Sequence, residues 1–128
     1  MKNDKQYQLQ SFTDGYQTCL AWSEGYEQYD YSATACEKNR KDCEAFVNEN
    51  YELLYQYIDL IVPNEWDGWE RAGHDFALTR NGHGAGFWDR DYKDKEGEKV
   101  GQALTEASKS AGWMCLYING VTNEIEID

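Results

Sequence analysis

Residues 74–90 hold the densest group of side chains in the chain that could perform chemistry. The group contains both histidines of the chain, together with carboxylates, a hydroxyl and guanidinium groups: His74, Asp75, Thr79, Arg80, His83, Asp89 and Arg90. Histidine beside carboxylates and arginine can carry out acid–base chemistry on a phosphoester or a glycosidic bond. Imidazole and carboxylate oxygens can also hold a divalent metal ion. This pattern defines a candidate catalytic or metal site made of His74, Asp75, Arg80, His83 and Asp89.

The same residues also fit a structural role, and we favour it. In this interpretation the aspartates pair with the arginines across a turn, and glycines supply the backbone angles that the turn needs. The run from Gly82 to Gly86 lacks the lysine and the strand–loop–helix setting of a phosphate-binding loop. We therefore expect the protein not to be an enzyme and to need no cofactor and no metal.

A β-hairpin is the element that we expect to position these side chains. Phe76, Leu78 and Arg80 alternate along the chain with Asp75, Ala77 and Thr79, and we interpret this as the period of a strand. The dipeptide Asn81-Gly82 follows, and Asn-Gly between two such runs is a strong hairpin signal. The alternative is a helix that continues through Arg80 and uses Gly82 as its C-cap.

Helices are expected on both sides of this segment. A spacing of three to four apolar residues predicts a first helix from Ser11 or Thr13 to about residue 26. A second helix should start near residues 32–34 and end at Pro63, either continuous or kinked near 48–50.

The C-terminal residues should form a helix and a second hairpin. Val100, Leu104, Ala107 and Ala111 predict an amphipathic helix that Gly112 ends, and strands follow at 113–118 and 124–127. The sequence thus predicts an α+β fold, in which N-terminal helices pack on a small antiparallel sheet and the C-terminal half has the order β-β-α-β-β.

Between Asp42 and Glu70 the chain has no lysine or arginine. This acidic stretch carries eight carboxylates and two tryptophans, which we predict to bind a partner: Asp42, Glu44, Glu49, Glu52, Asp59, Glu65, Asp67, Glu70, Trp66 and Trp69. Carboxylates without counterions repel one another, which costs stability. A role in which they present phosphate-like charge to a basic groove on a partner would explain why the chain keeps them. Tryptophan is enriched at interfaces. The alternative is an acidic helix that serves solubility alone.

Composition narrows the possible partners. The 128 residues suit a single domain, with an acidic helical half (1–70, net charge −9) and a second half (71–128, net charge −3). A total of −12 argues against direct binding of nucleic acid or of an anionic membrane. No apolar run is long enough to cross a membrane.

The four cysteines point to a reducing compartment. No CxxC pair and no secretory leader is present, so we expect free thiols in the cytoplasm. Cys36 and Cys43 are seven residues apart, which predicts buried positions on one helix face.

The segment GHDFALTRNGHGAGFWDR at 73–90 resembles a family of small, uncharacterised proteins of tailed bacteriophages and prophages. The resemblance extends over about residues 42–127 and includes Asp42–Phe46 and the Leu104–Ser108 helix. Ala77 departs from the family pattern, which usually has a bulky aromatic residue there. The resemblance implies a phage setting, in which small acidic proteins often bind and block host proteins.

Together these features predict a phage-derived acidic accessory protein in the bacterial cytoplasm. It would bind a basic groove on a host protein and inhibit a nucleic-acid-handling or defence system, as a DNA mimic. A small enzyme or metal-binding protein centred on His74–Arg90 is the alternative, and a virion or assembly protein is a further one.

Overall fold

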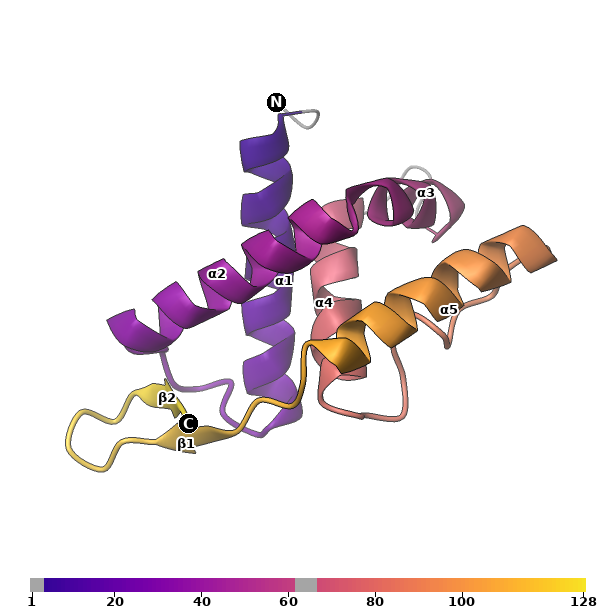
Figure 1. Cartoon of the computed structure of the whole chain (residues 1–128). Helices are drawn as coiled ribbons and strands as arrows, with labels where there is room; N and C mark the ends of the chain where they lie inside the picture. The colour runs from indigo at the N-terminus through magenta and orange to yellow at the C-terminus, as the bar shows by residue number, and fades with distance from the viewer. Residues whose placement is uncertain (1–3, 62–66) are drawn as a thin grey trace.

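The computed structural model describes residues 4–61 and 67–128, and within them the chain is mostly helical (Figure 1). Its elements in chain order are α1 (Lys5–Ser23), α2 (Ala33–Glu49), α3 (Tyr51–Ile61), α4 (Gly68–Arg80), α5 (Lys95–Ser110), β1 (Leu116–Ile118) and β2 (Ile125–Ile127). The two strands form an antiparallel hairpin in which Tyr117 lies opposite Glu126. In Figure 1 this hairpin lies near the beginning of α2, where Tyr31 also bridges to Ile125.

Helices α1 and α4 cross at two glycines. A Cβ atom on Gly15 would lie 2.0 Å from the carbonyl oxygen of Glu70, and one on Gly73 would lie 1.9 Å from that of Phe12. No other residue fits at such a distance from backbone atoms. These two glycines therefore set the separation of α1 and α4, on which the rest of the core is built.

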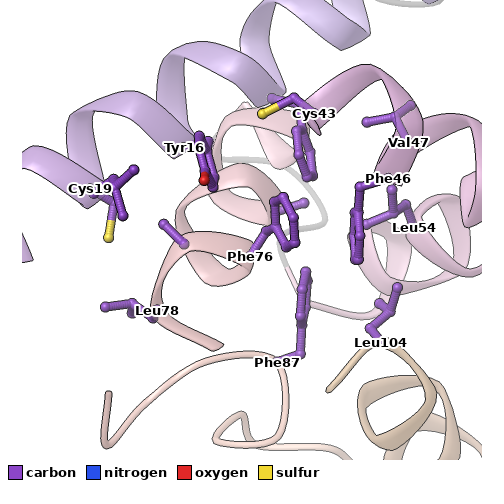
Figure 2. Close-up of a cluster of buried hydrophobic side chains, with 14 of the residues drawn as sticks. Tyr16, Cys19, Cys43, Phe46, Val47, Leu54, Phe76, Leu78, Phe87 and Leu104 are labelled. Carbon is purple, nitrogen blue, oxygen red and sulfur yellow. The ribbon is translucent and has the colours of Figure 1, made fainter. Parts of the chain in front are cut away.

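Aromatic rings fill the core that α1, α2, α3 and α4 enclose (Figure 2). The ring of Phe76 on α4 stacks on Phe46 of α2, with centroids 4.0 Å apart, and on Tyr16 of α1 at 5.1 Å. Phe87, from the loop after α4, meets Tyr57 of α3 edge to face at 5.0 Å. Burial of large aromatic surfaces is a dominant source of core stability, and here it draws on both halves of the chain.

The predicted α+β fold with a β-β-α-β-β C-terminal half is wrong. Residues 75–80 belong to helix α4, and 81–90 form a loop, so the first hairpin does not exist. Gly82 adopts a φ of +70°, the Gly82 amide donates to the Thr79 carbonyl, and the His83 amide donates to the Leu78 carbonyl. This pair of bonds is the Schellman motif that ends helices. Asn81-Gly82 therefore acts as a helix terminator, as the alternative interpretation held.

The apparent strand alternation arose because α4 is buried on almost every side. All residues from Asp75 to Arg80 are buried, so the polar, partly exposed side formed by Glu70, Arg71 and His74 does not continue through the second half of the helix. A helix surrounded by protein loses the 3.6-residue period that identifies an amphipathic helix. Asp67 caps its N-terminus by accepting from the amides of Trp69 and Glu70.

Other predicted elements are confirmed or corrected in detail. Helix α5 and the C-terminal hairpin are confirmed, and so is the predicted start of the second helix near 32–34, where Ser32 caps α2. The first helix begins earlier, at Lys5, with Asp4 as its cap. Helices α2 and α3 are separate, and the side chain of Asn50 donates to the Phe46 carbonyl at their junction. The predicted end of the second helix at Pro63 lies outside the described residues.

All four thiols are free, but the expected burial holds for only some of them. Cys19 and Cys43 are buried, whereas Cys36 and Cys115 are exposed. Burial raises the pKa of the Cys19 thiol to about 12. The predicted common buried face of Cys36 and Cys43 is therefore wrong, because Cys36 faces solvent from the first turn of α2.

Candidate functional site

Asp75, one of the predicted catalytic residues, is a fully buried carboxylate at the centre of a polar cluster. Arg90 donates to it through Nε, at 3.1 Å, and through Nη2, and the hydroxyl of Tyr57 donates to it as well. Arg71 and His74 each approach its Oδ1 to 3.8 Å. The cluster ties α3, α4 and the loop after α4 together.

The ionisation of Asp75 is favoured in spite of its burial. Burial alone would raise its pKa, but contacts with His74, Arg90 and Tyr57 outweigh burial and lower the pKa below its usual value. Burial also raises the pKa of the Tyr57 hydroxyl, so Tyr57 remains a donor to the carboxylate. Asp75 is thus a charged hydrogen-bond acceptor, and both of its oxygen atoms already accept hydrogen bonds from Tyr57 or Arg90.

Arg80 lies in a second buried cluster and does not join Asp75. Its Nε donates to the carbonyl of Gly112 at 2.6 Å and its Nη2 to that of Ala111 at 3.0 Å, which caps the C-terminus of α5. Its Nη1 donates to Asp42 at 2.8 Å and to the hydroxyl of Tyr16 at 3.0 Å. Arg80 therefore joins α1, α2 and α4 to the end of α5.

The two histidines line one groove together with Arg90. This groove has a volume of about 730 Å³ and lies between the end of α1, one side of α4 and the loop after it. Asp89, by contrast, is exposed and does not line it. Of the five predicted catalytic residues the structure thus brings only His74 and His83 to one groove, with Asp75 buried beside it. Within 4–61 and 67–128, no three His, Cys, Asp or Glu side chains are placed to hold a metal ion.

Several residues predicted to bind a partner are engaged within the fold. Asp42 pairs with Arg80, and Asp67 accepts from the hydroxyls of Tyr7 and Ser11 in addition to capping α4. Trp69 is buried and stacks on Tyr51, with ring centroids 5.5 Å apart. These contacts leave little of the three side chains for a partner.

The remaining acidic residues divide between exposed positions and positions that the structure does not describe. Glu44, Glu49, Glu52, Asp59 and Glu70 are exposed, while Glu65 and Trp66 lie outside the described residues. Glu44 lies 3.8 Å from Arg40. Glu49, Glu52 and Asp59 have no ion pair with any lysine or arginine that the structure describes, as their predicted role requires.

Helix α3 adds two apolar residues that the sequence prediction missed. Tyr55 and Leu60 are each 46% exposed, and they share one helix face with Glu52, Gln56 and Asp59 by their spacing of three and four. In the sequence, Tyr55 and Leu60 lie outside the apolar stripe that includes Leu54 and Tyr57, and this position could have identified them as exposed. We call Glu49, Glu52, Tyr55, Asp59 and Leu60 the acidic surface.

No protein-family model, no curated protein and no solved structure matches the chain. Among the described residues, no helix is both long and apolar enough to span a membrane.

Proposed function

We propose that this protein is an acidic accessory protein that binds a basic groove on another protein through the acidic surface. In the form that we favour, it acts in the cytoplasm of a bacterium infected by a phage, and its target is a host nucleic-acid-handling or defence protein. The resemblance of residues 73–90 to proteins of tailed bacteriophages supports this setting.

The observation that carries the proposal is that Glu49, Glu52 and Asp59 are exposed and form no ion pair among the described residues. Tyr55 and Leu60 are also exposed, on the face of α3 that carries Glu52 and Asp59. Carboxylates that neither cap a helix nor pair with a cation are available to meet lysine and arginine on a partner. Unpaired charges steer association, while an aromatic and a leucine side chain supply contact area that excludes water. The acidic surface thus combines the two components of a specific interface.

Phosphate mimicry is the most economical use of such a surface. The chain carries −12 overall, which repels nucleic acid and attracts proteins that bind nucleic acid. A protein that occupies the nucleic-acid groove of its target should compete with DNA for that groove.

The test is affinity capture from a lysate of a bacterial host, followed by competition with DNA. We expect the wild-type chain to retain a nucleic-acid-binding protein at low salt and to displace duplex DNA from that protein after purification. The triple variant Glu49→Lys, Glu52→Lys, Asp59→Lys should neither retain nor displace it.

A matched variant separates the acidic surface from overall charge. Asp30, Asp91 and Glu106 are exposed acids on other parts of the chain, and their reversal to lysine changes the net charge equally. Equal loss of capture by both triple variants would show that total charge, and not the acidic surface, determines binding. Full capture by the Glu49, Glu52 and Asp59 variant would refute the proposal.

A further inference from the structure

The C-terminal hairpin has one covered edge and one open edge (Figure 1). On the side of β2 that faces away from β1, the Ile125 amide donates to the carbonyl of Asp30 at 2.8 Å, and the Ile125 carbonyl accepts from the amide of Ser32 at 3.0 Å. The segment that leads into α2 therefore covers this edge. Among the described residues the sheet has two strands, so no third strand pairs with the side of β1 that faces away from β2. We call this side the open edge.

The register of the two strands shows which backbone groups of β1 point to the open edge. In an antiparallel pair, alternate residues direct their amide and carbonyl groups toward the neighbouring strand. The Asn119 amide donates to the Glu124 carbonyl at 2.9 Å, so Asn119 and every second residue before it face β2. The amides and carbonyls of Leu116 and Ile118 consequently face away from β2, and they form no hydrogen bond with another described residue there.

The side chain of Asn81 already pairs with the neighbouring position of this edge. Its Nδ2 donates to the Met114 carbonyl at 3.1 Å, and its Oδ1 accepts from the Met114 amide at 2.8 Å. These are the two bonds that one residue of an added antiparallel strand would make. Met114 is two residues before Leu116, so Asn81 occupies the beginning of the edge and leaves the positions of Leu116 and Ile118 open.

The open edge lacks the features that normally protect the edges of sheets. Such edges usually carry charged side chains or proline, which discourage pairing with another chain. Residues 113–122 contain no charged residue and no proline, although 28% of the chain is charged. Leu116 is buried in the core, so β1 is held in position by the rest of the fold. An unprotected edge on a fixed strand is suited to the addition of an extended peptide as a further strand.

The exposed face of the hairpin indicates the chemistry of such a peptide. Tyr117 is 47% exposed on the face opposite the buried Leu116, because side chains alternate along a strand. By the register of the hairpin, the same face carries three carboxylates that form no ion pair with a described lysine or arginine: those of Glu124, Glu126 and Asp128. Glu126 also accepts from the Ser32 hydroxyl, which leaves its charge uncompensated. Lysine and arginine bind both carboxylates and aromatic rings.

We propose that the open edge of β1 binds an extended, basic segment of a partner protein as a third strand. Two residues of the segment pair with Leu116 and Ile118, and their side chains lie on the core side of the sheet, where apolar residues fit. The residue between them lies on the exposed face beside Tyr117, about 10 Å from β2 by the spacing of neighbouring strands. A lysine or arginine there lies over the Tyr117 ring and extends toward Glu126. The preferred segment therefore alternates basic and β-branched residues.

This edge is separate from the acidic surface and suits a different protein better than a second copy of the chain. In Figure 1 the hairpin lies near the beginning of α2, whereas α3 follows the end of α2. A second copy would bring another net charge of −12 to a face that already carries three carboxylates. A basic segment brings the complementary charge instead.

Fluorescence anisotropy of a labelled peptide that contains Lys-Val-Arg-Val-Lys tests the proposal with the full chain. We expect this peptide to bind, and the same peptide with glutamate at the three basic positions not to bind. Methylation of both valine backbone nitrogens should weaken binding at least about tenfold, because these amides face the open edge. Methylation of the arginine backbone nitrogen is the matched control. This amide faces away from β1, so most of the binding should remain.

Two proline variants make the same comparison in the protein. Ile118→Pro removes an amide of the open edge but none of the bonds between β1 and β2, and should weaken peptide binding about tenfold. Ile127→Pro is the matched control, because the Ile127 amide also faces away from the partner strand, but on the far side of β2. Circular dichroism shows whether both variants are folded.

A pair of charge variants keeps the test valid if the proline variants do not fold. Glu124→Gln combined with Glu126→Gln should weaken peptide binding, whereas Glu49→Gln combined with Glu52→Gln should not. The second pair lies on the acidic surface, so this comparison separates the open edge from the function proposed above.

Several results would overturn the proposal. Absence of binding at millimolar peptide would do so, as would equal binding of the glutamate peptide. Equal effects of methylation at valine and at arginine, of the two proline variants, or of the two charge variants would show that the peptide does not pair with β1. Sedimentation of the chain alone as a dimer that Ile118→Pro dissociates would show that a second copy occupies the edge, which would also overturn the proposal.

Discussion

The charged residues of 74–90 and those of the acidic surface occupy opposite environments. Asp75 and Arg80 are buried and bonded to partners from other elements, whereas Glu52 and Asp59 point into solvent without an ion pair among the described residues. A buried charge that loses its partner is costly, while an exposed charge contributes little to stability. The difference shows which charges hold the fold together and which are available to a partner.

The largest expected effect comes from Asp75→Asn. It removes the buried carboxylate that pairs with the partly buried Arg90 guanidinium, so we expect the free energy of unfolding to fall by about 3 kcal/mol. Asp59→Asn, the same chemical change at an exposed position, should change it by less than about 0.5 kcal/mol. Urea unfolding measures both values, and equal values would remove the contrast between the two regions.

Acid should weaken the same cluster. The pKa of Asp75 is lowered in the folded chain, so its contribution to stability is complete above the unfolded pKa of about 3.9 and is lost as the pH falls through the lower folded value. Urea midpoints measured across this range should fall steeply for the wild type. The urea midpoint should decline less steeply for Asp75→Asn. Parallel curves of midpoint against pH for the two proteins would contradict the assignment of this acid sensitivity to Asp75.

Arg80→Ala should have the next largest effect. It removes the donors to Gly112 and Ala111 and leaves Asp42 without a buried partner, which we expect to cost about 2 kcal/mol. Arg40→Ala is the control, because Arg40 forms only exposed pairs with Glu37 and Glu44. Thermal unfolding compares the two, and an equally small change for both would show that the Arg80 cluster contributes little.

The four cysteines allow the same comparison of buried and exposed positions for uncharged side chains. The measured quantity here is the rate of thiol modification, and no change in stability is expected. Titration of the native chain with a thiol reagent should modify two thiols rapidly, those of Cys36 and Cys115. Cys19 and Cys43 should react only on unfolding, because burial removes them from solvent and raises their pKa values. Rapid modification of all four thiols would contradict this placement. Two rapidly modified thiols in a Cys36→Ser variant would also contradict it.

The sequence predicted those elements whose pattern is local. The α5 helix has one apolar face, and the C-terminal strands flank a turn of Asn119-Gly120, so period and turn chemistry identified both.

The sequence did not predict what depends on contacts between distant residues. Helix α4 is buried on almost every side, and Asn81-Gly82 suits either a hairpin or a helix end, so local pattern favoured the wrong element. The pairing of Arg80 with Asp42 joins residues 38 positions apart, and nothing in the neighbourhood of either residue indicates it. The candidate site changed for this reason, because the residues of 74–80 lie on different sides of α4 and those of 81–90 form a loop.

The salt dependence of association tests the central claim most directly. With the captured partner protein, we predict an association rate that falls steeply as salt rises for the wild type, because unpaired carboxylates steer the encounter. The Glu49→Lys, Glu52→Lys, Asp59→Lys variant should lose this salt dependence together with its affinity. The control variant, in which Asp30, Asp91 and Glu106 are changed to lysine, should keep most of its affinity and most of the salt dependence. An association rate that is independent of salt in the wild type, or equally steep in the acidic-surface variant, would contradict the claim.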